Sequence, residues 1–258
     1  MDPFPSLDLL GVRLDLVDLP SLMNFVTSSV RKQSPVTLMY LNIHVSNLAR
    51  TNPELRKALH EANLVYCDGE GIRLASRFLG KHLPPRMTGA DFIWDLANRC
   101  ATEKLRLFWL GGEPKIAALA AARLCKKFPT LKIVGTHHGH FKKSETRSDE
   151  IISKINSANP HIVLLGMGSP IQEIWINKYR EAISAPVVWC IGATADFVTG
   201  KQPRAPRWML ANGMEWLYRF ELEPRRLFFR YAIGNPWFFC RLLRQRLHEF
   251  WRLGTRPG

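Results

Sequence analysis

Short apolar runs alternate with helical patterns from residue 36 to residue 191, and this alternation limits the possible folds more than any other feature of the chain. The apolar runs at 36–41, 64–67, 106–110, 132–136, 162–165 and 187–191 have the length of strands. Helical patterns separate them at 53–62, 71–79, 89–99, 114–127, 146–157 and 170–183. Strands that are almost continuously apolar and separated by helices predict a parallel sheet covered on both faces.

The alternation ends near Gly200, and we place a domain boundary there. Residues 1–200 are expected to form a Rossmann-like α/β domain. Residues 201–258 are expected to form a C-terminal helical appendage, with helices at about 206–220, 224–232 and 236–252, each beginning at a proline.

The appendage is rich in both positive charge and aromatic rings. It holds twelve Lys or Arg against four acids, and so carries eight of the chain's fourteen net positive charges, together with twelve aromatic residues. Such a surface suits a phosphate-bearing partner with an apolar part, either an anionic membrane or a nucleic acid. The other interpretation is a basic helical subdomain with a buried aromatic core.

The chain shows no sign of export or of a membrane span. The N-terminus lacks the basic and apolar regions of a signal peptide, and the apolar runs are far shorter than a span. Five cysteines are scattered without a CxxC pair, which fits buried thiols in a reducing compartment. We therefore expect a cytoplasmic protein that can lie on a membrane surface.

Polar residues just past each predicted strand mark the candidate site, because ligands of an open parallel sheet bind outside the carboxyl ends of its strands. We expect six places on one rim: Asn42, Asp68, 111–112, 137–140, 166–168 and 192–196. Asp68 leaves a buried strand at a tight turn, where it is either a general base or the cap of the next helix. Arg86 precedes a helix, where it either binds a diphosphate or pairs with a carboxylate.

The run from Gly166 to Gln172 predicts a strand end, a glycine-rich turn and a helix start, but it is neither GxGxxG nor a Walker motif. Gln172 is either directed at the rim or on the surface. The histidines around Gly139 have no Cys or His partner at ligand spacing, so we expect no metal site there. The chain also has no Asp-x-Asp, so the charge of a diphosphate would be neutralised by Arg86 and backbone amides.

Taken together, these residues resemble the WecG/TagA/CpsF family of bacterial glycosyltransferases (glycosyltransferase family 26) from about residue 36 to about residue 239. The first motifs are Asn42, Asp68-Gly69-x-Gly71, Arg86-x-x-Gly89-x-Asp91, Gly139-His140-Phe141 and Gly166-x-Gly168-x-Pro170-x-Gln172-Glu173. The later ones are Asp196-Phe197, Gly200, Arg204-Ala205-Pro206-x-Trp208, Gly213-x-Glu215-Trp216-Leu217-Tyr218-Arg219, Glu223-Pro224-x-Arg226 and Arg230-Tyr231.

The resemblance implies an inverting, metal-independent transfer from a UDP-sugar to a polyprenyl-pyrophosphate-linked sugar at the cytoplasmic face of the membrane, with no cofactor. The family's catalytic base falls on Asp68, its diphosphate-contacting arginine on Arg86 and its active-site glutamine on Gln172. Its asparagine near the donor sugar falls on Asn42. Gly139 and Asp196 match positions at the nucleoside end of the donor.

Two residues depart from the family pattern: Tyr40 stands where many members have Thr, and His140 where many have Tyr. The bulkier Tyr40 beside the donor pocket favours glucose, as in exopolysaccharide-building members, over N-acetylmannosamine-type donors. Tyr40, His140, Gly166 and Gly168 complete the predicted donor site.

With this resemblance, the appendage is expected to bind a membrane. Its rings would enter the headgroup boundary, and its arginines would meet lipid phosphates or the acceptor's pyrophosphate. The arginines concerned are Arg204, Arg207, Arg219, Arg225, Arg226 and Arg230.

The same residues bear on two other functions and on the number of subunits. A nucleic-acid-binding α/β protein is the alternative function, but the positive charge recurs with apolar spacing rather than as a dense patch, so we expect no nucleic acid. An NAD-type dehydrogenase would need GxGxxG after an early strand, and this is absent. The sequence leaves a monomer and a homo-oligomer open.

Overall fold

The computed structural model of the chain describes residues 4–254, and the side chains of residues 4–247. Its centre is a six-stranded sheet in the order β4-β3-β8-β7-β5-β6, in which all neighbouring strands are parallel. The strands are β3 (Val36–Leu41), β4 (Leu64–Cys67), β5 (Arg106–Gly111), β6 (Lys132–His137), β7 (Ile162–Gly166) and β8 (Val187–Cys190). The predicted parallel sheet is confirmed, and each strand ends within one residue of its predicted bound.

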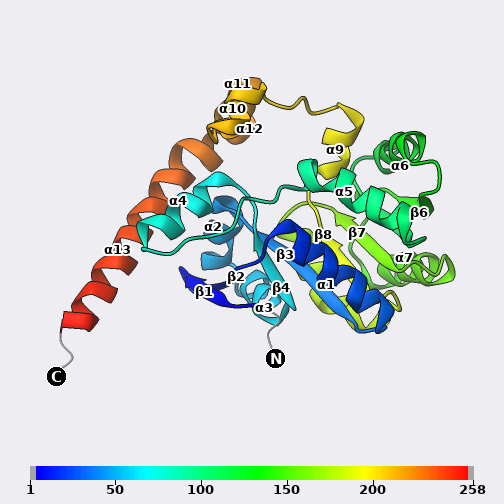
Figure 1. Cartoon of the computed structure of the whole chain (residues 1–258), viewed down its shortest axis with the longest axis horizontal. Helices are drawn as coiled ribbons and strands as arrows, with labels where there is room; N and C mark the ends of the chain where they lie inside the picture. Colours follow the sequence, from blue (N-terminus) through cyan, green and yellow to red (C-terminus); the bar gives the residue numbers. More distant parts are fainter. Residues whose placement is uncertain (1–3, 255–258) are drawn as a thin grey trace.

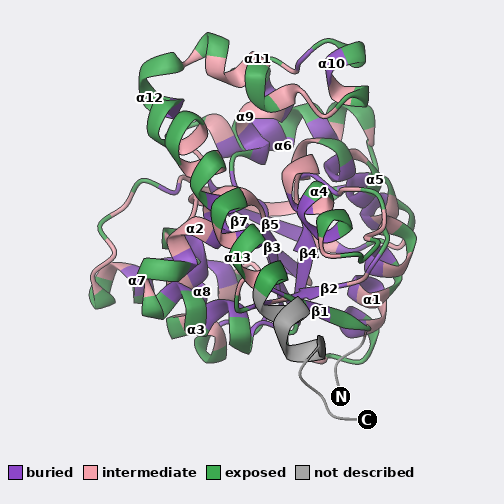
Figure 2. Ribbon diagram, turned by 90° about the vertical axis from the view of Figure 1, so that its left-hand side faces the viewer, coloured by how far each residue is buried: buried purple, intermediate pink, exposed green. Residues whose placement is uncertain are grey.

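Helices cover both faces of this sheet (Figure 1). On one side of the strands lie α2 (Ile43–Thr51), α3 (Pro53–Glu61), α7 (Glu145–Ser157) and α8 (Ile171–Tyr179), and on the other lie α1 (Leu19–Arg31) and α5 (Gly89–Thr102) (Figure 2). α6 (Ile116–Lys127) packs against α9 (Thr194–Thr199), which also contacts α5. Because both faces are covered, every residue of β3, β4, β7 and β8 is buried.

An N-terminal hairpin of β1 (Ser6–Leu9) and β2 (Val12–Asp15) was not predicted. Its two-residue turn is Leu10-Gly11, with φ of 57° and 81°, a left-handed pair that suits a tight hairpin. The hairpin is tied to the sheet because the Val65 N–H donates to the buried Asp15 carboxylate over 2.7 Å. The helices α1, α2 and α9 were also not predicted.

The C-terminal segment consists of α10 (Arg207–Ala211), α11 (Glu215–Leu222), α12 (Pro224–Phe228), a π-helical turn (Phe229–Ile233) and α13 (Gly234–Gly254). The single helix predicted at 206–220 is wrong, because the chain turns at Gly213, where φ is 70°. The break predicted before Pro236 is also wrong. Pro236 has no N–H to donate to the preceding helical turn, and the wider π turn at Phe229–Ile233 accommodates this missing donor.

α13 runs along the outside of the α/β domain and packs against α2 (Figure 1). Its side chains Phe238 and Leu242 are fully buried in the main hydrophobic core. The Asn47 side chain of α2 donates to the Gly234 carbonyl over 2.7 Å and accepts from Arg241 over 3.2 Å. The C-terminal segment therefore shares the core of the α/β domain.

Two further features bear on the expected compartment and membrane contact. Cys240 on α13 is exposed, so the expected burial of all five thiols is wrong for this one, whereas Cys67, Cys100 and Cys190 are buried. None of the helices within residues 4–254 combines the length and the apolar character that crossing a lipid bilayer requires.

Candidate active site

A pocket of about 770 Å³ lies at the carboxyl ends of β3, β4 and β8. One wall is formed by the residues that follow these strands, and the other by the C-terminal segment, through residues that include Trp216, Arg219, Arg230 and Tyr231. The strand order reverses between β3 and β8, and such a switch point is where open α/β sheets bind ligands. The volume is that of a small-molecule site.

Asn42 and Asp68 meet in this pocket. Asn42 follows β3 and caps α2, because its Oδ1 accepts from the Val45 N–H over 3.0 Å. Its Nδ2 donates to Asp68 Oδ2 over 3.1 Å. The cap fixes which way the amide faces, so its donor group is directed at Asp68. The structure thus brings together the predicted residues after β3 and β4.

Asp68 does not cap the helix that follows it. α4 (Glu70–Phe78) has Gly69 at its N-cap, with φ of 109° and no side-chain hydrogen bond. Burial raises the pKa of the Asp68 carboxyl, while the hydrogen bond from Asn42 and the charge of Arg230 lower it, and burial has the larger effect. A carboxylate with a raised pKa is a better proton acceptor, so the geometry favours the general-base alternative for Asp68.

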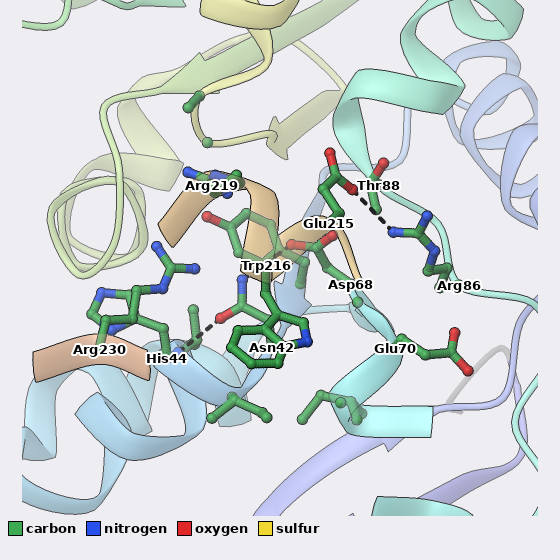
Figure 3. Close-up of a pocket in the computed structure, with 18 of the residues that line it drawn as sticks. Asn42, His44, Asp68, Glu70, Arg86, Thr88, Glu215, Trp216, Arg219 and Arg230 are labelled. Carbon is green, nitrogen blue, oxygen red and sulfur yellow. Dashed lines mark hydrogen bonds and ion pairs between the residues drawn. The ribbon is translucent and has the colours of Figure 1, made fainter. Parts of the chain in front are cut away.

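Arg86 lines the pocket and also pairs with a carboxylate. Its Nη1 lies 3.3 Å from Glu215 Oε2, and Arg204 Nη1 lies 2.7 Å from Glu215 Oε1. Arg204 in turn pairs with Asp91 in the first turn of α5. This chain of ion pairs joins α11 to the loop before α5 and holds Arg86 at the pocket wall (Figure 3).

Arg219 and Arg230 lie on the other side of Asp68 from Arg86 (Figure 3). Neither makes an ion pair with a carboxylate of the described residues, and Arg219 Nε is buried without a hydrogen-bond partner. Burial lowers the pKa of Arg230, but an arginine stays charged at any physiological pH. Burial also lowers the pKa of the pocket residue His44 to about 4, so this imidazole is neutral at pH 7. Two guanidinium groups near Asp68 that have no described carboxylate within ion-pair distance suit an anionic ligand.

Gln172 is fully buried and lies behind the pocket wall. Its Nε2 donates to Tyr40 Oη over 3.2 Å, and its Oε1 accepts from the Gly192 N–H over 3.3 Å. Gln172 is therefore linked to the pocket by its hydrogen bond to Tyr40, which lines the pocket. Gly168 also lines the pocket, whereas Gly166 allows close backbone packing: a Cβ there would lie 2.6 Å from the Gly192 carbonyl oxygen.

Gly139, His140 and Asp196 lie outside the pocket lining, in a neighbouring group. The Gly139 N–H donates to the Gly112 carbonyl over 2.8 Å. Asp196 Oδ1 is buried without a partner, and burial raises the pKa of this carboxyl, whereas the nearby Lys201, Arg226 and His140 lower it. Arg226 also lines the pocket, so this group adjoins the pocket directly.

The remaining predicted arginines divide between the pocket and the surface. Arg204 lines the pocket, whereas Arg207 and Arg225 are exposed and outside it. Glu215, Trp216 and Ser169 line the pocket but were not predicted to act there. Glu215 and Trp216 belong to a motif that resembles the family, and Ser169 belongs to the glycine-rich turn, so the sequence carries a signal for all three.

Within the described part of the chain, no three His, Cys, Asp or Glu side chains are grouped so that they could hold a metal ion.

The chain is similar to known proteins over nearly its whole length, including the residues that line the pocket. The family described as glycosyl transferase WecG/TagA/CpsF matches residues 7–251 of the chain. An N-acetylglucosaminyldiphosphoundecaprenol N-acetyl-beta-D-mannosaminyltransferase of Bacillus spizizenii is 29% identical over 249 residues, which cover 95% of this chain and 92% of that protein. Both matches include the α/β domain and the C-terminal segment.

Proposed function

This chain belongs to the WecG/TagA/CpsF family of glycosyl transferases, and we propose that it transfers a hexose from a UDP-sugar to a sugar linked to a polyprenyl diphosphate. The position of Asp68 in the pocket supports this proposal most directly. Its carboxylate lies beside Asn42, between Arg86 on one side and Arg219 and Arg230 on the other. A base flanked by cations suits a reaction that removes a proton and releases a diphosphate.

In this reaction Asp68 accepts the proton of an acceptor hydroxyl while that oxygen attacks the anomeric carbon of the donor. The bond from the anomeric carbon to the diphosphate oxygen breaks on the opposite face, so the configuration inverts. The bonding electrons leave with UDP, and the proton stays on Asp68. The guanidinium groups of Arg86, Arg219 and Arg230 stabilise the charge that develops on the departing diphosphate.

The donor is proposed to extend from Asp68 toward Asp196. Tyr40, Asn42, Gly166 and Gly168 would surround the sugar and diphosphate, with Gln172 acting through Tyr40. Gly139, His140 and Asp196 would hold the nucleoside, because they form a group next to Arg226, which lines the pocket.

Glucose is the proposed donor sugar, because Tyr40 lines the pocket where many members of the family have the smaller threonine. The Bacillus spizizenii relative is named for an N-acetylmannosaminyl group and for an acceptor of N-acetylglucosamine on undecaprenyl diphosphate. The acceptor of this chain is proposed to be of the same lipid-linked class, in the synthesis of an exopolysaccharide or another cell-surface polymer.

The C-terminal segment is proposed to place the pocket on the cytoplasmic face of an anionic membrane. Trp208, Phe228 and Phe229 expose 60%, 48% and 73% of their surface. The exposed Arg207 and Arg225 lie in the same segment, where they would contact lipid phosphates. We propose that residues 1–200 form the catalytic unit and that the residues from 201 onward form its membrane contact and one wall of its site.

A donor screen tests the proposed reaction. Purified protein is mixed with vesicles that carry polyprenyl-diphosphate-linked N-acetylglucosamine, and UDP release is measured with UDP-glucose, UDP-N-acetylglucosamine and UDP-N-acetylmannosamine. We expect acceptor-dependent release from UDP-glucose. Release from UDP-N-acetylmannosamine alone would show that this chain transfers the sugar for which the relative is named. If none of the three donors gives acceptor-dependent release, the proposed reaction is contradicted.

The arginines around Asp68 also predict that the reaction needs no divalent cation, because they supply the charge that a metal would otherwise bring to the diphosphate. Transfer is expected to continue unchanged in excess EDTA. Loss of activity in EDTA that returns on adding Mg²⁺ or Mn²⁺ would contradict this part of the proposal.

A further inference from the structure

A buried relay of polar side chains lies behind the pocket wall. Ser169 Oγ lies 2.7 Å from Glu173 Oε1 and 3.2 Å from Tyr40 Oη. Gln172 Nε2 donates to both Glu173 Oε1, over 2.7 Å, and Tyr40 Oη, over 3.2 Å. Glu173 and Gln172 are fully buried, whereas Tyr40 and Ser169 line the pocket. The relay therefore connects a carboxyl group in the core to a hydroxyl at the site.

The surroundings of Glu173 favour its protonated form. Its Oε2 is buried with no hydrogen-bond partner, and none of the described Lys, Arg or His side chains forms an ion pair with it. The titratable groups that face it are Tyr40 from β3 and Cys190 from β8, and burial raises the pKa of both, so neither is charged near neutral pH. Burial likewise raises the pKa of Glu173, and this effect is larger than that of the hydrogen bonds from Gln172 and Ser169, which lower it. An unpaired carboxylate here would be strongly disfavoured.

The protonation state of Glu173 decides the direction of the hydrogen bonds from Glu173 through Ser169 to Tyr40. An ionised Glu173 would accept from Ser169, and Ser169 would then accept from Tyr40, so the phenolic proton would be directed away from the pocket. A protonated Glu173 donates to Ser169, and Ser169 donates to Tyr40. The Tyr40 oxygen also accepts from the Gln172 amide. With both acceptor positions filled, the Tyr40 proton is available only to the pocket.

We propose that neutral Glu173, acting through Ser169, makes the Tyr40 hydroxyl a hydrogen-bond donor toward the pocket, where it binds an oxygen of the donor sugar. Tyr40 is then a specificity-determining residue, and Glu173 and Ser169 are positioning residues. The sugar contact rests on the proposed function, whereas the direction of the relay does not. Gly192 gives the hydroxyl its space, because a Cβ there would lie 2.8 Å from Tyr40 Oη.

Infrared spectroscopy of the protein without substrate tests the direction of the relay. At pH 7 we expect a carboxylic-acid carbonyl band in the wild type that is missing from Glu173→Gln. Ser169→Ala retains Glu173 but removes its partner, so the same band is expected to shift in that variant, which assigns the band even if Glu173→Gln fails to fold. A wild type with no acid band that responds to either substitution has an ionised Glu173, and the proposal is then overturned.

Ligand binding tests the contact with the sugar. The dissociation constants of UDP-glucose and of its deoxy and fluoro analogues, one ring position at a time, are measured calorimetrically for the wild type and Tyr40→Phe. At one position we expect the deoxy analogue to bind the wild type about tenfold more weakly, and the fluoro analogue to recover part of the loss, since fluorine accepts but does not donate. In Tyr40→Phe the three ligands are expected to bind alike.

The outcomes separate the two proposals. Equal losses for the deoxy and fluoro analogues at the position that responds to Tyr40→Phe would show that Tyr40 accepts, and would overturn the inference. The inference is also overturned if no ring position responds to that substitution. If UDP-sugars do not bind the wild type at all, the proposed function fails, and the infrared band alone decides the direction of the relay.

Discussion

The Asn42 amide makes two different contacts, and these can be separated by substitution. Its oxygen caps α2 at the Val45 N–H, and its nitrogen donates to Asp68. The first contact stabilises the fold, and the second lowers the pKa of the proposed base. Serine at this position would keep the cap, because a hydroxyl accepts the same N–H well, but it is too short to replace the donor to Asp68.

We therefore predict different results for Asn42→Ser and Asn42→Ala. Both remove the hydrogen bond that lowers the pKa of Asp68, so that pKa rises further. Because the base must be ionised, the acid side of the pH profile of kcat/KM moves to higher pH in both variants. Only Asn42→Ala also loses the cap of α2, and this loss is expected to lower the free energy of unfolding, measured in urea, by about 1 kcal/mol. An unmoved acid limb in Asn42→Ser would assign the limb to another group.

The elements of the α/β domain are largely predictable, because four of the six sheet strands, β3, β4, β7 and β8, are buried throughout and each is a mainly apolar run. The missed elements lack this signal. Charged residues at Asp8, Arg13 and Asp15 interrupt the hairpin strands. α2 follows β3 after the single residue Asn42, so no glycine or proline marks the end of the strand and the start of the helix. The helix predicted to break at Pro236 continues because a π turn absorbs the missing N–H, which sequence patterns do not reveal.

At the scale of elements, ion pairs of Glu215 connect α11 to the α/β domain. Glu215 pairs with Arg86 and Arg204, and its side chain is only 13% exposed. Arg86 and Glu215 are 129 residues apart, so no local pattern could have predicted the pair. The docking of α11 and the position of Arg86 in the pocket are therefore coupled.

Glu215→Gln is expected to weaken this docking by about 1 to 2 kcal/mol, because two charged hydrogen bonds lose their charge. Limited proteolysis between α9 and α11 should become several-fold faster, and transfer should fall with it. Glu221→Gln is the matched control, since Glu221 is an exposed acid of the same helix with no ion pair among the described residues. Equal proteolysis of the two variants and the wild type would contradict the coupling.

At the scale of the whole molecule, most of the large apolar residues that are exposed lie on the C-terminal segment, from Trp208 to Leu247. The rings that were predicted to face a membrane divide into two sets. Phe238 is buried in the core, whereas Phe229 exposes 73% of its surface. The sequence could predict the ring-rich composition but not this division, which depends on the face that α13 turns toward α2.

Phe229→Ala is expected to weaken binding to anionic vesicles about tenfold in a sedimentation assay, equivalent to about 1.4 kcal/mol of apolar contact. Leu119→Ala serves as the control, because Leu119 is an apolar residue, 46% exposed, on α6 in the α/β domain. Binding that falls equally in both variants, or in neither, would remove Phe229 from the membrane contact. The side chain of Trp251, which belongs to the same predicted set, lies outside the described side chains.

The candidate site shows the same limit of prediction. Asn42 and Asp68 were predictable because the carboxyl ends of parallel strands share one edge. The division of the arginines was not, because it depends on how the C-terminal segment folds back over that edge. Arg219 and Arg230 face the pocket, whereas Arg207 and Arg225 remain exposed.

The most direct test of the account is sugar transfer by Asp68→Asn, which keeps the shape of the side chain and removes its ability to take a proton. With vesicles that carry the lipid-linked acceptor and the donor found in the screen, we expect kcat to fall by about 10²- to 10⁴-fold, with the donor still bound. Transfer by Asp68→Asn at the wild-type rate would contradict the role of Asp68 as the base, on which the proposed mechanism depends.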